Sequence, residues 1–332
     1  MKNLESAKHF FKRKIESILL RQGYSILKTE RIESVYRQLG RAYDICIFNA
    51  SLPTEENGAN KEEITGMVFS KDRPMQLQAL LDSYFHFVTN PAPLYILYKT
   101  TSKEYASAYS QIFEVYKTKP VIFRKENHFR NDVSAIIKGM ATPKVFFLVD
   151  DIIFIDDFDM AFIRQFDVKK YIFSLRLGKN IKYSYMIGKY IHSPSDIEED
   201  ESGSFISWRW YNAASYWGYP LSLDGHVFSR DEILLMVTIS EFSSPNSLEV
   251  ALQSFKYSFL QRYGAAFPIS KIVNIPINRV QNEYQNKAEK HNDDKKLLRL
   301  WNQGYRYNVS NFCKIANLSA HEPIALDIIK ER

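Results

Sequence analysis

The sequence contains little cysteine and glycine and has no long apolar run. Only two of its 332 residues are cysteines, Cys46 and Cys313, and they form no CxxC pair, so neither a zinc knuckle nor a disulfide framework is indicated. No two of the twelve glycines form a GxG pair and no Walker A motif is present, which argues against dinucleotide-binding and P-loop enzymes. The longest apolar stretches, 145–149 and 152–155, fall short of the roughly 20 residues that span a bilayer.

The charge of the chain is balanced and only mildly basic. There are 44 Lys and Arg against 38 Asp and Glu, a net charge of +6, and no long basic run stands out. A nucleic-acid-binding protein concentrates its positive charge in a patch or motif, so no nucleic-acid partner is predicted. The content of 45% hydrophobic and 25% charged residues is that of a folded globular protein. The scarcity of cysteine and the lack of a signal peptide predict a cytoplasmic location.

Changes in composition divide the chain into four parts. Residues 1–50 are predicted to form a helical, basic N-terminal extension, and the polar stretch 51–63 a linker. Residues 64–285 form the predicted main domain, and 286–332 a helical C-terminal segment. Within the extension, residues 7–20 place apolar side chains at helical spacing among basic ones. We expect this helix to pack on the main domain; the alternative is peripheral contact with the inner face of an anionic membrane.

Strands and helices alternate from Ile64 onward. Apolar runs predict strands at 64–70, 94–99, 120–123, 144–149 and 171–177. Amphipathic stretches predict helices at 73–88, 103–116, 131–139 and 157–166. This alternation predicts an α/β fold in which helices flank a mostly parallel sheet, with helical additions at both ends. In such sheets ligands bind at the carboxyl ends of the strands.

Two polar segments follow strands of this predicted sheet. Residues 70–73 (Ser-Lys-Asp-Arg) come after the first strand, and Asp150 and Asp151 come after the fourth. A carboxylate among apolar residues needs a partner, because an isolated buried charge is costly. Mg²⁺ or Mn²⁺ is a suitable partner, since both bind carboxylate oxygens and keep positions open for phosphates. The alternative is that one aspartate caps the next helix or pairs with an arginine.

Three segments carry a resemblance to a known enzyme family. The runs MVFSKDRPMQLQALLDSYF, LYILYK and FFLVDDIIF resemble the nucleotide-sugar half of a GT-A-type glycosyltransferase, family-2-like, whose sheet is Rossmann-like. The resemblance covers roughly residues 64–260. It implies that Ser70, Asp72 and Arg73 lie near the nucleotide. It also implies that Asp150 and Asp151 provide the ribose and metal contacts, with Asp151 as the metal ligand.

Residues 171–228 supply further candidates for the site. Arg176 is expected to contact a phosphate, unless it is a surface arginine on an edge strand. Three tryptophans cluster within ten residues and are candidates for stacking on an acceptor sugar, with core packing as the alternative: Trp208, Trp210 and Trp217. Asp224 and His226 lie in a glycine-containing loop that the resemblance places on the acceptor side of the site.

Glu249 is the first candidate for a catalytic base. It lies near the start of a helix predicted at 246–259, where the resemblance implies a carboxylate that takes the acceptor proton. The alternative is a capping box with Asn246 or Ser247 as cap. Asp224 is the second candidate for the base. His321 is a candidate metal ligand, although a lone histidine more often has a structural role.

The predicted function is transfer of a sugar from a nucleotide-sugar donor to a glycan or lipid-linked acceptor. A Mn²⁺ or Mg²⁺ cofactor and cationic side chains neutralise the leaving diphosphate, and a carboxylate removes the acceptor proton. One carboxylate on the side of the sugar opposite the leaving group predicts inversion of configuration at the anomeric carbon. The resemblance to the family implies a role in bacterial surface-polysaccharide synthesis. The alternative is a non-catalytic nucleotide-sugar or glycan-binding module of the same fold, which the absence of a third acid at Ile152 favours.

Overall fold

The computed structural model describes residues 63–276, 294–313 and 315–331, and a few helical positions between 36 and 48. The predicted N-terminal extension and linker therefore lie almost wholly outside the described residues, as does the helix expected at 7–20. At the described positions of the extension, Ile45 is buried and the Arg41 guanidinium lies 4.8 Å from the ring centre of Phe255. Within the described ranges, every helix is too short or too polar to span a bilayer.

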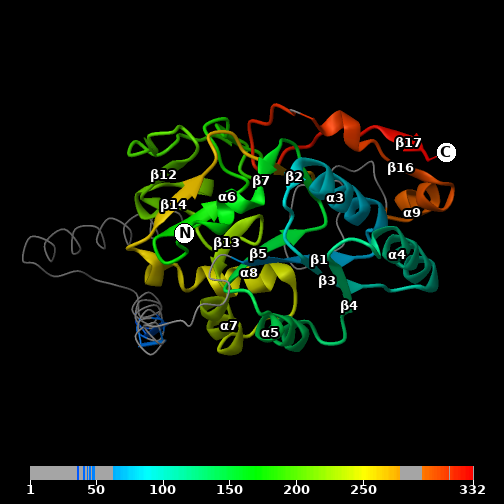
Figure 1. Ribbon diagram of the computed structural model, residues 1–332, viewed down its shortest axis with the longest axis horizontal. Coiled ribbons are helices and arrows are strands. Elements are labelled where there is room, and N and C mark those ends of the chain that lie inside the picture. Colours follow the sequence, from blue (N-terminus) through cyan, green and yellow to red (C-terminus); the bar gives the residue numbers. More distant parts are fainter. Residues whose placement is uncertain are drawn as a thin grey trace, which may run out of the picture.

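A nine-stranded sheet forms the centre of the molecule (Figure 1). Its strands, in spatial order, are β11 (Glu198–Glu199), β12 (Ile206–Trp208), β14 (Tyr263–Ala266), β8 (Tyr171–Ser174), β13 (His226–Ser229), β5 (Lys144–Val149), β1 (Ile64–Lys71), β3 (Leu94–Lys99) and β4 (Val121–Lys125). The pairings across the sheet show that β12 and β13 run against the direction of the other seven strands. The predicted α/β fold with a mostly parallel sheet is confirmed.

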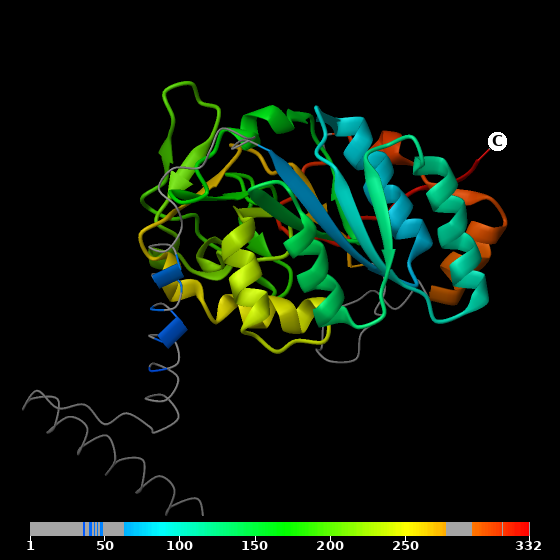
Figure 2. The same cartoon turned by 60° about the horizontal axis from the view of Figure 1, so that its bottom comes forward.

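Helices cover both faces of this sheet (Figure 2). On one face, α3 (Pro74–Phe87), α4 (Lys103–Tyr116) and α9 (Asp294–Asn302) pack against one another. On the other face lie α5 (Phe129–Gly139), α7 (Arg230–Thr238) and α8 (Pro245–Gln253). Strand β1 contributes side chains to the hydrophobic cores on both faces of the sheet, because successive strand residues point to opposite faces. Ile64 and Val68 belong to the core beneath α3, whereas Met67 and Phe69 belong to the core beneath α5.

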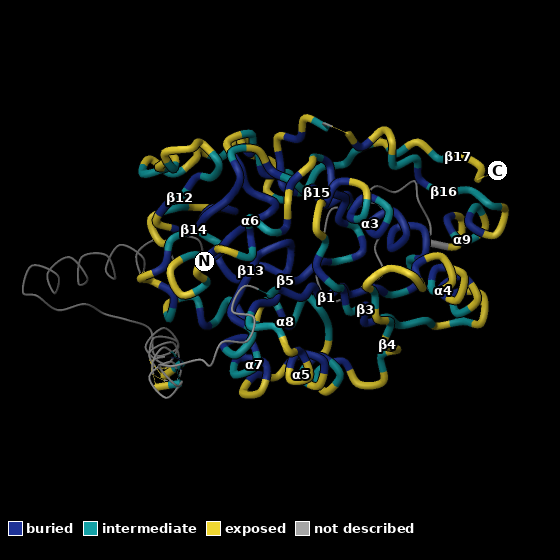
Figure 3. Tube along the Cα trace, viewed as in Figure 1, coloured by how far each residue is buried: buried dark blue, intermediate teal, exposed yellow. Residues whose placement is uncertain are grey.

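Short two-stranded pairings hold the connections between these elements. They join β2 (Val88–Thr89) to β7 (Phe158–Asp159), β6 (Ile152–Phe154) to β15 (Ile272–Asn274), β9 (Tyr183–Ser184) to β10 (Lys189–Tyr190), and β16 (Tyr305–Tyr307) to β17 (Ile328–Lys330). Single 3₁₀ turns occupy Trp210–Asn212, Ser215–Gly218, Lys256–Phe259 and Val309–Phe312. As Figure 3 shows, the central strands are buried, and exposed residues gather on the outer helices and loops.

Three predicted helical regions differ from the structure. The helix expected at 246–259 ends at Gln253 in α8, and a separate 3₁₀ turn follows at Lys256–Phe259. The helix expected at 157–166 is shortened to α6 (Met160–Arg164), because β7 pairs with β2 just before it and the Asp159 side chain caps its first turn. The C-terminal segment was expected to be helical, yet its described residues contain α9 followed by the β16 and β17 pair. Gly304 adopts φ +83°, a left-handed conformation that suits glycine at the end of a helix, and there the chain turns from α9 into β16.

A buried ion cluster links α7 to the strand β14. Arg262 donates to both carboxylate oxygens of Glu232, at 2.8 and 2.5 Å, and Lys169 lies 3.0 Å from the same carboxylate. Both members of the arginine–glutamate pair are buried. Burial alone raises the pKa of Glu232, but the hydrogen bonds and charges of Arg262 and Lys169 outweigh it and hold that pKa below its ordinary value. The pair is therefore ionised at neutral pH.

Replacing Glu232 with glutamine is expected to lower the free energy of unfolding by about 3–5 kcal/mol, because Arg262 then stays buried without its charge partner. Urea unfolding at neutral pH measures the loss. Since the folded-state pKa of Glu232 is lowered, its contribution is present above the ordinary pKa and disappears as pH falls through the folded-state value. Glu241→Gln is the matched control, because Glu241 also pairs with an arginine but is 86% exposed. Equal losses in the two variants would contradict the buried-pair explanation.

Candidate active site

The carboxyl ends of β1 and β5 bring the two predicted polar segments together. These strands are parallel neighbours, with Phe69 opposite Val149, so the residues that follow them meet at one edge of the sheet. The Arg73 Nη1 atom lies 2.9 Å from Asp150 Oδ1 and 3.5 Å from Asp151 Oδ2. The Lys71 backbone N–H donates to the other Asp150 oxygen at 3.3 Å. Arg73 therefore bridges the acid pair, as the arginine-pairing alternative predicted.

The acid pair carries more negative charge than Arg73 neutralises. Burial raises the pKa of Asp150, although Arg73 and its hydrogen bond oppose the rise. Burial also raises the pKa of Asp151 to about 7; Arg73 opposes this, while the nearby carboxylates of Asp150 and Asp224 add to it. The Asp151 side chain is the more open of the two, 22% exposed against 6% for Asp150. A cationic ligand that reached Asp151 would relieve this excess charge.

The turn after β1 is held by its own side chains. Asp72 has φ +56°, a left-handed conformation that aspartate tolerates better than most residues. Its carboxylate accepts the Thr101 backbone N–H and hydroxyl, each at 2.8 Å, which ties the turn to the end of β3. The Ser70 hydroxyl lies 2.5 Å from the Tyr109 hydroxyl, which also accepts the Arg73 backbone N–H. Ser70 and Asp72 thus shape the turn that presents Arg73.

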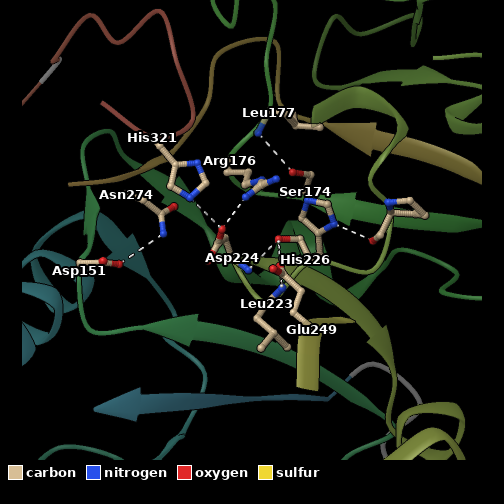
Figure 4. Close-up of polar contacts among 12 residues, drawn as sticks. Asp151, Ser174, Arg176, Leu177, Leu223, Asp224, His226, Glu249, Asn274 and His321 are labelled. Carbon is tan, nitrogen blue, oxygen red and sulfur yellow. Dashed lines mark hydrogen bonds and ion pairs between the residues drawn. The ribbon is translucent and has the colours of Figure 1, made fainter. Parts of the chain in front are cut away.

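A second polar cluster is centred on Asp224 (Figure 4). The Arg176 Nη1 atom donates to Asp224 Oδ2 at 2.5 Å, and His321 Nε2 lies 3.5 Å from the same oxygen. Arg176 is 2% exposed and its guanidinium lies 5.2 Å from the ring centre of Tyr216. The alternative of a surface arginine is therefore wrong: Arg176 is a buried counterion. Burial raises the pKa of Asp224, but Arg176, His321 and the Asn274 amide together hold it below its ordinary value.

Glu249 lies beside Asp224 and holds the loop that carries it. Its Oε1 atom accepts the Ser222 hydroxyl at 2.8 Å and the Leu223 backbone N–H at 3.0 Å. The capping-box explanation for Glu249 is wrong, because α8 is capped by Ser244 in a reciprocal box with Ser247. Burial and the neighbouring Asp224 charge raise the pKa of Glu249, with Arg176 opposing. A carboxyl group with a raised pKa is a stronger proton acceptor than an ordinary one.

The tryptophans and His226 lie inside the protein. The three indoles are at most 3% exposed: Trp208, Trp210 and Trp217. Trp208 donates its N–H to the Trp217 carbonyl, and Trp210 donates to the Phe259 carbonyl. His226 is 2% exposed, its Nδ1 lies 2.8 Å from the Pro220 carbonyl, and burial lowers its pKa to about 3. No ring face is left for a sugar, so the packing alternative explains the tryptophans, and the geometry does not support an acceptor contact for His226.

The residues near Asp151 fit a metal that a substrate helps to bind. In the described part of the chain, no three His, Cys, Asp or Glu side chains gather as a ready-made metal cage. Mg²⁺ is usually held by one or two carboxylates plus substrate phosphates, and Mn²⁺ prefers the same oxygen ligands. Asp151 is the more exposed carboxylate of the acid pair and would be the residue to hold such an ion. His321, the second predicted ligand, directs Nε2 to Asp224, and its Nδ1 has no hydrogen-bond partner among the described residues.

Asn274 also belongs to this cluster, and the sequence analysis did not select it. Its Nδ2 atom donates to Asp151 Oδ1 at 3.4 Å, and it lies between Asp151 and His321 (Figure 4). The sequence held one signal that points to it. Asn274 is the polar residue inside the otherwise apolar run IVNIPI, where a buried amide needs a specific partner.

Comparison with known proteins gives one sequence match. No protein-family profile matches the chain. Over 205 residues, 54% of its length, the chain is 24% identical to the bifunctional glycosyltransferase pgtA of Dictyostelium discoideum. The chain resembles a glycosyltransferase. This resemblance, predicted from the strand-end motifs, is confirmed by the match. The chain spans a quarter of the length of that curated relative.

Several solved structures match parts of this chain with low TM-scores and low sequence identity. TarS residues 1–349 of S. aureus, in complex with UDP-GlcNAc, give a TM-score of 0.40 at 14% identity, covering 63% of this chain and 56% of TarS. A nucleotidyl transferase from Methanothermobacter thermautotroptrophicus gives 0.34 at 11% identity, covering 64% and 91%. The mannosyltransferase PcManGT from Pyrobaculum calidifontis, in complex with GDP-Man and Mn²⁺, gives 0.28 at 10% identity, covering 45% and 46%.

Proposed function

We propose that this chain is a glycosyltransferase that moves a sugar from a nucleotide-sugar donor to a glycan or lipid-linked acceptor. One observation carries the proposal: an arginine-bridged acid pair at the ends of β1 and β5 lies near a second carboxylate cluster, so that Asp224 influences the pKa of Asp151. A donor diphosphate and an acceptor hydroxyl need these two kinds of group on opposite sides of the transferred sugar. The sequence match to a glycosyltransferase supports the same reaction class.

On the donor side, the turn at 70–73 and the acid pair are proposed to hold the nucleotide diphosphate. Arg73 is proposed to contact a phosphate, and Asp150 to contact the ribose. Asp151, with His321 as a second ligand, would hold Mg²⁺ or Mn²⁺. A bound divalent cation supplies positive charge that stabilises the departing diphosphate. Arg176 is buried against Asp224, so its proposed role is to fix that carboxylate.

On the acceptor side, Glu249 is the proposed base and Asp224 its alternative. The raised pKa of Glu249 favours proton uptake, whereas Asp224 is held ionised by Arg176 and accepts a proton less readily. Attack by the activated hydroxyl on the face opposite the diphosphate inverts the anomeric carbon. A cytoplasmic enzyme of bacterial surface-polysaccharide synthesis is the setting that we propose.

A thermal-shift screen of nucleotide sugars, with and without manganese, tests the proposal. A donor at 100 times its dissociation constant stabilises the folded state by about 2.7 kcal/mol, which raises the melting temperature. The matching nucleoside monophosphates, which lack the diphosphate, are the control and should shift it less. A donor that binds without turnover against any acceptor would favour the non-catalytic module. The absence of a shift with every donor would contradict nucleotide-sugar binding.

A further inference from the structure

The backbone of Asn274 is fixed by two segments that are distant in sequence. It ends β15, where it pairs antiparallel with Ile152, the residue after the acid pair. Its N–H donates to the Ala320 carbonyl at 2.9 Å, and its carbonyl accepts the Glu322 N–H at 3.0 Å. The next residue, Ile275, donates its N–H to the Asp151 carbonyl at 2.8 Å. Asn274 therefore has a fixed position relative to Asp151.

Residues 317–322, which we name the C-terminal strap, are anchored on their other side. The Leu318 carbonyl accepts the N–H groups of Lys182 and Tyr183, each at 2.9 Å. Buried Asn317 accepts from the Asn180 amide at 3.0 Å and donates to the Ser319 carbonyl at 3.0 Å. The strap thus runs between β9 and β15 and is bonded to both. This arrangement brings His321 close to Asp224. It also places Ala320 and Glu322 where they hydrogen-bond to the Asn274 backbone.

The side chain of Asn274 is directed to Asp151, and its backbone holds the strap that carries His321 to Asp224. Asn274 is 3% exposed, its Nδ2 donates to Asp151 Oδ1 at 3.4 Å, and His321 Nε2 lies 3.5 Å from Asp224 Oδ2. Its Oδ1 atom is buried with no hydrogen-bond partner among the described residues. An asparagine that served only the fold would be expected to have its oxygen paired as well, because an unpaired buried acceptor is costly. Here the amide nitrogen is directed to the Asp151 carboxylate.

We propose that Asn274 is a positioning residue that sets the Asp151 and Asp224 carboxylates in one fixed relation, so that donor and acceptor groups are aligned for transfer. The inference rests on the proposed function. A neutral amide is suited to this task because it donates to the Asp151 carboxylate without adding charge beside Asp224. Aspartate has nearly the same shape, but it would add a negative charge between two acids and remove the donors.

Kinetics of two Asn274 variants test the proposal. Asn274→Asp and Asn274→Leu are expected to lower kcat by about 100-fold, the scale of a 1 Å misplacement of reacting groups, with a much smaller change in donor KM. Asn317→Leu is the matched control, since it removes a buried amide from the strap without touching either acid. It is expected to lower thermal stability and to leave kcat within about threefold of the original protein.

The outcomes separate this inference from the proposed function. An unchanged kcat in both Asn274 variants overturns the positioning role, as does an equal loss of kcat in Asn317→Leu, which would assign the effect to strap displacement. If the original protein turns over no donor, the proposed function fails and a crystal structure of Asn274→Leu decides the inference. Displaced Asp151 and Asp224 carboxylates in that structure would support the positioning role, and unmoved ones would overturn it.

Discussion

Replacing Asp151 with asparagine is expected to lower the rate of sugar transfer by about 100- to 1000-fold while the protein stays folded. The side chains have the same size, but asparagine lacks the charge that attracts a divalent cation to the donor diphosphate. Burial and two neighbouring acids raise the pKa of Asp151 to about 7, so its ionised form is unfavourable for the fold. Removing that charge should therefore leave the melting temperature unchanged or higher. Steady-state rates and thermal melts measure the two effects separately.

Asp156→Asn is the matched control for Asp151→Asn. Asp156 follows β6, the strand after the acid pair, but its carboxylate pairs with Lys271 instead of Arg73 and is partly exposed. This variant is expected to keep transfer within about threefold, because the ion pair it loses is peripheral. Transfer that persists in Asp151→Asn at every manganese concentration would count decisively against a metal role for this residue.

Replacing Glu249 with glutamine is expected to lower kcat by about 10²- to 10⁴-fold with donor binding intact. Glutamine keeps an oxygen that can accept from Ser222 and Leu223, so the loop that carries Asp224 should stay in place. It cannot take a proton from the acceptor, and this is the step that fails. Single-turnover rates and donor titration by calorimetry measure the two properties.

The pH profile gives a second test of the base. The pKa of Glu249 is raised, so kcat/KM should fall with decreasing pH at a higher pH than an ordinary glutamate would give, because the protonated carboxyl group accepts no proton. Glu249→Gln should lose the part of this acid limb that Glu249 causes and keep the part that Asp151, with a pKa of about 7, contributes. If Glu249→Gln loses donor binding instead of turnover, the base role passes to Asp224, and Asp224→Asn should then remove the acid limb.

The central strands and helices were predictable because their signals are local. The apolar runs at 94–99 and 144–149 coincide with β3 and β5, and the stretch at 103–116 coincides with α4. Ser102 caps α4 through its side chain, as such a residue before an amphipathic run predicts. The start of α6 was not predictable, because its first expected turn is taken by a strand pairing with β2, 70 residues away.

The site was predictable only where neighbouring strands determine it. Residues 70–73 and the acid pair meet because β1 and β5 are adjacent and parallel, which the α/β pattern implies. The environments of Trp208 and Arg176 depend on tertiary packing, and a cluster of aromatic residues fits a core as well as a sugar site. Asn274 could not be placed, because its contacts join segments around residues 151, 274 and 320 that no periodicity connects.

The threading of the C-terminal strap between β9 and β15 has a consequence for biosynthesis. The chain leaves the ribosome from its N-terminus, and β1, β3 and β5 can pair long before residue 322 has been made. His321 and two backbone partners of Asn274, Ala320 and Glu322, are made only after these strands. A nascent chain that has assembled its central strands therefore still lacks the segment that hydrogen-bonds to Asn274 and brings His321 to Asp224.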